Sequence, residues 1–189
     1  MANDRSQIRG TVLVEDRRTE RFFRELLVDL GFDKRKITFK PAPSGRGDAG
    51  DWVRAQYPAE VNLLRQKRHQ RRLFLLAARD GDNEGLAKRK ADLDRALDEQ
   101  ALDARQDSER IVTPVPTWSI ETWLLALLGD ATVDEDESRK RDFERRYPGK
   151  QEGQTLQDAA QAWRSKADQI PSVPSLADSK TEMNRMDLS

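Results

Sequence analysis

The sequence predicts a three-layer α/β fold, in which helices cover both faces of a parallel sheet, with a helical C-terminal extension. Three observations lead to this prediction. Short apolar segments alternate with segments of helical periodicity in the order β-α-β-α-β-α-β-α. One of them, residues 73–78 (LFLLAA), is continuously apolar, which is typical of a strand buried on both faces. After Gly129 the composition becomes strongly charged, which marks the start of the extension.

The first strand and helix are predicted over residues 11–31. Residues 11–15 (TVLVE) form a β-branched run that ends in an acid, as a buried strand does. Apolar residues then recur at helical spacing, at Phe22, Phe23, Leu26, Leu27 and Leu30. Either Asp16 or Thr19 is expected to cap the first turn of this helix, and Gly31 to end it.

The middle of the chain is predicted to add two further strand–helix units. Residues 36–40 (KITFK) alternate as a short strand does, and a loop rich in proline and glycine follows over residues 41–50. Residues 51–70 have helical spacing, with a kink or a break expected at Pro58. The continuously apolar strand comes next and leads into a charged helix over residues 84–104.

A fourth strand and its helix complete the predicted core. Residues 110–116 (RIVTPVP) indicate a strand stopped by prolines, and residues 120–128 (IETWLLALL) a nearly all-apolar helix. We place the α/β core at residues 8–129 and the charged helical extension at residues 130–189. Within the extension we expect a helix over residues 155–168 and one last short helix in the tail.

The composition excludes several classes of protein. Of 189 residues, 36% are hydrophobic and 36% charged, which indicates a small core beneath a heavily charged surface. The 34 basic residues balance 34 acidic ones, which argues against binding of nucleic acid by bulk charge alone. The absence of cysteine excludes disulfides, zinc–thiolate sites and thiol catalysis, and the single histidine, His69, excludes multi-histidine metal sites.

Neither a leader nor a membrane span is predicted. The first ten residues (MANDRSQIRG) are polar, and no run approaches the roughly 18 apolar residues of a membrane helix. We therefore expect a cytoplasmic protein without membrane contact.

Acidic residues follow three of the four predicted strands. Glu15 ends the first strand, Asp80 and Asp82 follow the third, and Glu121 lies after the fourth. Because parallel strands lie about 4.8 Å apart, and their carboxyl ends share one edge, these acids are expected to lie roughly 5–10 Å from one another. Oxygen-only ligands suit Mg²⁺ or Mn²⁺. Alternatively these acids only cap helices, as acids at strand ends often do.

Basic residues suggest contacts to phosphate at two places. Arg46, in the glycine-rich loop after the second strand, is a candidate substrate contact at the same edge as the acids. The run 67–72 (KRHQRR) precedes the third strand and so emerges at the opposite edge. It is either a solvated helix end or a distal contact to nucleic acid or a partner.

Three segments together resemble the TOPRIM family, and in particular its small stand-alone RloB-type members. They are residues 12–32 (VLVEDRRTERFFRELLVDLGF), 73–85 (LFLLAARDGDNEG) and 114–128 (PVPTWSIETWLLALL). The family has a glutamate at the end of its first strand and an Asp-x-Asp after its third, and it implies a Rossmann-like core. This chain departs from the pattern at Asp16, where the family usually has glycine, so that Asp16 either crowds the site or caps the helix.

The resemblance implies metal-dependent cleavage of nucleic-acid phosphodiesters, in antiphage defence and together with an ATPase partner. Glu15 would be the general acid/base or a metal-associated carboxylate. Asp80 and Asp82 would be Mg²⁺ or Mn²⁺ ligands, and Glu121 a supporting acid. DNA and RNA are both candidate substrates, and a second copy of the chain is a further candidate partner.

Two other functions fit parts of the same sequence. A response-regulator receiver begins in a similar way, but it requires an acceptor aspartate about 40 residues later and a lysine before a proline, and PVPTWS contains no lysine. The second alternative is a non-catalytic regulatory subunit, in which the acids bind a structural ion and the charged segment 134–146 docks a partner.

Overall fold

The computed structural model describes residues 5–44, 49–69 and 72–187. Its centre is a four-stranded sheet in the order β2-β1-β3-β4. The strands are β1 (Arg9–Val14), β2 (Ile37–Pro41), β3 (Leu73–Ala77) and β4 (Ile111–Val112). All neighbours are parallel, with Thr11 of β1 opposite Thr38 of β2 and Leu75 of β3. This confirms the predicted α/β class and is consistent with a Rossmann-like fold.

Within the described residues, seven α-helices accompany this sheet. They are α1 (Arg17–Asp29), α2 (Ala49–Lys67), α3 (Gly85–Glu99), α4 (Ile120–Leu127), α5 (Lys140–Arg146), α6 (Glu152–Lys166) and α7 (Pro174–Met183). None of them is both long and apolar enough to cross a membrane.

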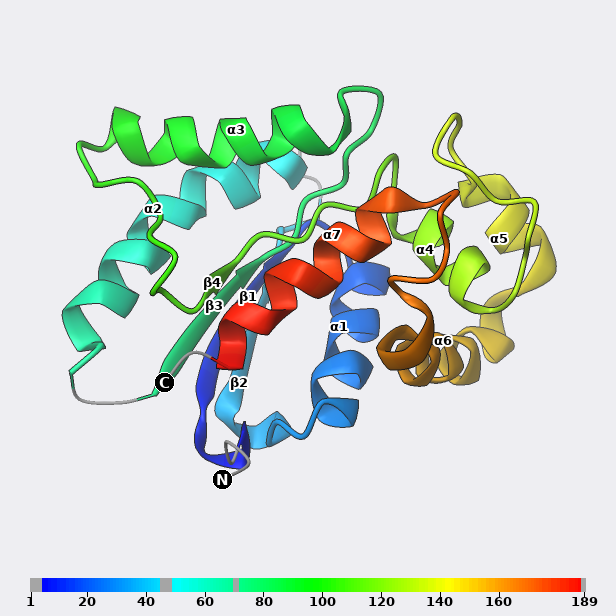
Figure 1. The fold of residues 1–189 in the computed structure, drawn as a ribbon, viewed down its shortest axis with the longest axis horizontal. Helices are drawn as coiled ribbons and strands as arrows, with labels where there is room; N and C mark the ends of the chain where they lie inside the picture. Colours follow the sequence, from blue (N-terminus) through cyan, green and yellow to red (C-terminus); the bar gives the residue numbers. More distant parts are fainter. Residues whose placement is uncertain (1–4, 45–48, 70–71, 188–189) are drawn as a thin grey trace.

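The sheet has helices on both faces (Figure 1). Helices α2 and α3 cover one face, where Leu13 and Leu75 pack with Val53 and Leu97. Helices α1, α4, α6 and α7 lie on the other face, where the alternate strand residues, such as Leu76, join a larger apolar core. The period of two in each strand therefore divides its side chains between two cores.

The C-terminal helices are part of the larger core. Trp163 of α6 and Leu176 of α7 are buried in the same cluster as the side chains of α1 and α4. Helix α7 is also joined to α4 by a hydrogen bond of 2.6 Å from the indole Nε1 of Trp123 to Oγ of Ser175. Residues 130–187 thus complete the layer of helices on this face of the sheet.

Local structure differs from the sequence prediction in one helix, one strand and one helix end. Of the kink or break expected at Pro58, the break is not observed: α2 runs through Pro58, because the packing of Val53, Tyr57 and Val61 outweighs one missing backbone hydrogen bond. Strand β4 has only two residues, since Pro114 and Pro116 lack the N–H that a ladder needs. Helix α3 ends at Glu99, short of the predicted residue 104.

Candidate functional site

The carboxylate of Glu15 lies at the point where β1 and β3 end. Its side chain is 12% exposed, and its Oε1 accepts a hydrogen bond of 3.1 Å from the backbone N–H of Asp80. Burial raises the pKa of Glu15 from its ordinary 4.5 to about 7, although Arg79 and this hydrogen bond both lower it. Near neutral pH Glu15 can therefore both accept and release a proton.

Asp80 is surrounded by the other acids of this edge. Desolvation raises its pKa well above the ordinary value, and the charges of Glu15, Asp16, Glu121 and Asp82 raise it further. Among the described residues the Asp80 side chain has no ion-pair or hydrogen-bond partner, and it is only partly buried. Of the acids at the strand ends, the structure thus brings Glu15 and Asp80 together, and the other acids are near enough for their charges to act on Asp80.

Asp82 points away from this pair toward α3. It is 57% exposed, and it accepts a hydrogen bond of 2.7 Å from Nη2 of Arg89. Its φ of 46° is left-handed, and its N–H donates to the carbonyl of Trp118, which also has a positive φ, of 64°. Between the two aspartates, Gly81 lies against the next loop, where an added Cβ would come within 2.9 Å of the Pro116 carbonyl oxygen. This close backbone contact fixes the Asp-Gly-Asp turn.

Glu121 is buried and is held by an arginine of α1. Nη1 of Arg18 donates to its carboxylate, and Nε of the same arginine donates to Glu152 over 3.1 Å. The Arg18 guanidinium also lies 5.1 Å from the centroid of the Phe143 ring. Glu121 is therefore part of an ion-pair network that joins α1, α4 and α6, and does not face water as a first-turn acid would.

Asp16 has turned to cap a helix. Its carboxylate accepts hydrogen bonds from the N–H groups of Arg18 and Thr19, of 2.7 and 2.9 Å, at the start of α1. Of the two roles considered for this departure from the TOPRIM pattern, capping is the one observed, although the charge of Asp16 still raises the pKa of Asp80.

The donor chemistry at this edge fits a hard divalent cation in part. Glu15 and Asp80 offer carboxylate oxygens, and a cation would relieve the crowding that raises the pKa of Asp80. Asp82 and Glu121, however, are engaged by Arg89 and Arg18. Within the described part of the chain, no three histidine or acidic side chains are grouped as a metal ion requires. The pair Glu15 and Asp80 is thus the part of the predicted ligand set that fits.

Arg79 is a residue of this site that was not among the predicted site residues. It is 1% exposed, its Nε lies 3.7 Å from the Glu15 carboxylate and its Nη1 3.9 Å from that of Asp92. The sequence could have indicated Arg79 as a site residue, because it lies between an apolar strand and an Asp-x-Asp motif. Arg89 was missed as well, seven residues after Asp82 and on the next helix.

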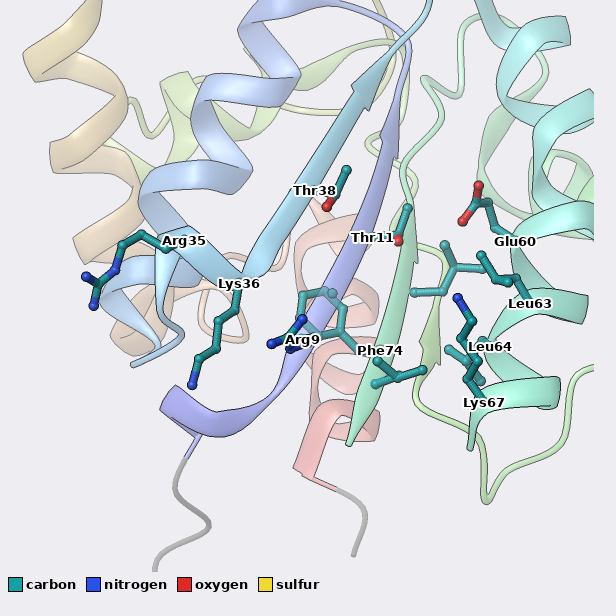
Figure 2. Close-up of a pocket in the computed structure, with 13 residues that line it drawn as sticks. Arg9, Thr11, Arg35, Lys36, Thr38, Glu60, Leu63, Leu64, Lys67 and Phe74 are labelled. Atoms are coloured by element: carbon teal, nitrogen blue, oxygen red, sulfur yellow. The ribbon is translucent and has the colours of Figure 1, made fainter. Parts of the chain in front are cut away.

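Other candidate residues lie elsewhere. Arg46, the predicted substrate contact, is outside the described residues. Lys67 ends α2 and, with Arg9, lines a cavity of about 270 Å³ at the amino end of the sheet, opposite the acids. Figure 2 shows this cavity, with Arg9 on β1 and Lys67 on α2. In the described part of the chain neither cation has an ion-pair partner.

Comparisons of this chain with protein-family models, with curated proteins and with solved structures give no match.

Proposed function

We propose that this protein is a Mg²⁺- or Mn²⁺-dependent TOPRIM-type nuclease, or a nuclease subunit, that acts on the phosphodiesters of nucleic acid. The observation that supports this best is the position of Glu15 and Asp80 together at the carboxyl edge of β1 and β3. Ligands of open parallel sheets bind outside this edge. Two adjacent carboxylates with raised pKa are also a common feature of catalytic sites.

In this proposal the two acids have different roles. Asp80, with Glu15 beside it, would hold the divalent ion, which supplies activation of water and charge neutralisation at phosphorus. Glu15, whose pKa is about 7, is suited to take up or release a proton near neutral pH. Asp82 would join the ligand set only if Arg89 releases it, and Glu121 would support the site through Arg18.

We further propose that the protein works in antiphage defence with an ATPase partner. The sequence resemblance to RloB-type TOPRIM proteins supports both the role in defence and the ATPase partner. A balanced net charge also fits a nuclease that depends on a partner or on local contacts to hold its substrate. Co-purification from the native host tests the partner.

A second candidate is a regulatory subunit without catalysis. It is favoured by the ion pairs of Asp82 with Arg89 and of Glu121 with Arg18, because acids engaged in this way stabilise the fold and are withdrawn from chemistry. A receiver-like signalling domain is a third candidate. The order β2-β1-β3-β4 is also that of the first four strands in flavodoxin-like sheets.

Cleavage assays separate these candidates. Labelled DNA and RNA are incubated with the protein in Mg²⁺, in Mn²⁺ and in EDTA, alone and with the co-purified partner. We expect cleavage only with a divalent ion. A receiver would instead incorporate phosphate from acetyl phosphate at an aspartate, and a regulatory subunit would retain its partner without cleaving either nucleic acid.

A further inference from the structure

Arg79 is a buried charge with two unpartnered nitrogens in the described part of the chain. A guanidinium has five N–H donors and keeps its charge in proteins. Within the described residues, Nε and Nη1 of Arg79 are buried and have no hydrogen-bond partner. The nearest carboxylate oxygens, on Glu15 and Asp92, are 3.7 and 3.9 Å away, which is too far for hydrogen bonds. Because burying unpaired donors is unfavourable, this arrangement points to a ligand that completes it.

Arg79 lines a cavity of about 540 Å³ beside the candidate acids. The cavity lies between the start of α2, the turn after β3 and helix α3. Arg89 lines it as well. The Arg89 side chain is 14% exposed; its Nη2 and Nη1 pair with Asp82 and Glu84, and its Nε is buried with no partner among the described residues. Two arginines with unused donors thus share one cavity.

The other charges of this cavity largely neutralise one another. Three of the carboxylates in its wall already have a cation: Asp82 pairs with Arg89, Glu84 with Lys88, and Asp92 with Arg95. The fourth, Asp51, has no ion pair in the described part of the chain. Among the described residues Arg79 has the two longer contacts given above, and the charge of Asp51 also acts on it. None of these carboxylates is within hydrogen-bond distance of Arg79, so the donors of Arg79 are what the cavity offers to an incoming anion.

We propose that this cavity binds a backbone phosphate of a nucleic-acid strand between Arg79 and Arg89, an inference that rests on the nuclease function proposed above. The planar fork of arginine matches phosphate oxygens in geometry and charge. Arg79 precedes Asp80 in the chain and contacts Glu15, so the phosphate held here neighbours the phosphodiester that faces the acids. The site would align the strand for cleavage.

Strand binding without cleavage tests this site. A labelled single strand of about 12 nucleotides is titrated in EDTA, and its anisotropy is followed at several salt concentrations. We compare Arg79→Met, which has similar length, with Arg89→Gln, whose partly exposed position makes a folding defect less of a concern. Lys34→Gln removes an exposed cation on the turn before β2, at the opposite edge of the sheet, and serves as the matched control. Thermal melting checks that each variant is folded.

We expect Arg79→Met and Arg89→Gln each to weaken binding by about tenfold and to lower the salt slope by about one, with Lys34→Gln within about twofold of wild type. Equal strand binding by all four proteins would overturn the strand site, and so would an equal loss in Lys34→Gln. If the strand binds all proteins equally while inorganic phosphate stabilises only the wild type and Lys34→Gln, the cavity takes a small phosphate instead of a strand. If the wild type binds the strand through these arginines but never cleaves it, the proposed nuclease function is wrong and the proposed phosphate site is retained.

Discussion

The Glu15 carboxylate accepts a hydrogen bond from the backbone N–H of Asp80, with 3.1 Å between Oε1 and N. This contact joins the ends of β1 and β3, the two central strands of the sheet. It places two acids side by side in a partly desolvated position, where both pKa values are raised.

Divalent ions should stabilise the protein. A ligand that binds only the folded state adds about 1.4 kcal/mol at a tenfold excess over its Kd, which corresponds to roughly 3–6 °C in Tm for a chain of this size. We expect this increase with millimolar Mg²⁺ or Mn²⁺, and its loss in Asp80→Asn. Differential scanning fluorimetry measures both. A Tm that stays constant throughout the titration would argue against any metal site at this edge.

Asp80→Asn should stabilise the metal-free protein, while Asp82→Asn should leave it unchanged. The first substitution removes a charge that desolvation and four neighbouring acids disfavour, for a gain of about 0.5–2 kcal/mol. Asp82 is exposed and paired with Arg89, so its loss should change the unfolding free energy by less than about 0.5 kcal/mol. Asparagine also tolerates the left-handed φ at this position. Urea denaturation compares the two variants, and equal effects would contradict the difference described between these aspartates.

Stability should fall as the pH rises toward neutrality. The pKa of Glu15 is about 7 in the folded protein and near 4.5 when unfolded, so between these values the folded state binds more protons. The stabilisation is complete below the unfolded pKa and is lost as the pH passes through the folded one. Asp80 acts in the same direction.

Glu15→Gln isolates the contribution of that carboxyl group. In EDTA we expect the decline in unfolding free energy between about pH 5 and pH 8 to be smaller in this variant than in the wild type. Identical profiles would show that Glu15 has an ordinary pKa and is not suited to proton transfer at neutral pH.

Gly81→Ala should destabilise the protein, because its Cβ would come within 2.9 Å of the Pro116 carbonyl oxygen. We expect a loss of about 1–3 kcal/mol, as for other overpacked positions. Gly153→Ala is the matched control. Gly153 lies in α6, where the nearest atom to an added Cβ is the flexible end of Arg21 at 3.4 Å, so alanine should stabilise by up to about 1 kcal/mol. Chemical denaturation of both variants would reveal whether the turn tolerates a side chain.

The sequence predicted the sheet and the gathering of acids because both depend on local patterns. The apolar runs of β1 and β3 identify buried strands, and parallel strands bring their carboxyl ends to one edge. The place of α6 and α7 in the core was not foreseen, since Trp163 and Leu176 contact residues far away in the chain. A helical period shows which face is apolar and gives no indication of what it packs against.

The ion pairs of the site could not be predicted from the sequence either, because their partners lie far apart in the chain. Arg18 and Glu121 are 103 positions apart, so nothing local indicates that they meet. Arg79 has the appearance of a strand flank in the sequence, and only the fold shows that its guanidinium is buried between β1, β3 and α3. These arginines determine which of the predicted acids remain available for chemistry.

If Glu15 and Asp80 perform metal-dependent cleavage, the rate of cleavage depends on both carboxylates and must fall in Glu15→Gln and in Asp80→Asn. The assay uses labelled DNA and RNA in Mg²⁺ or Mn²⁺ with the partner present, and Asp98→Asn, an exposed acid on α3, is the control. We predict that both site variants lose activity by about two orders of magnitude or more while the control stays at the wild-type rate. If both site variants, folded and stable, cleave as fast as the wild type, the two acids are structural and the nuclease proposal is wrong.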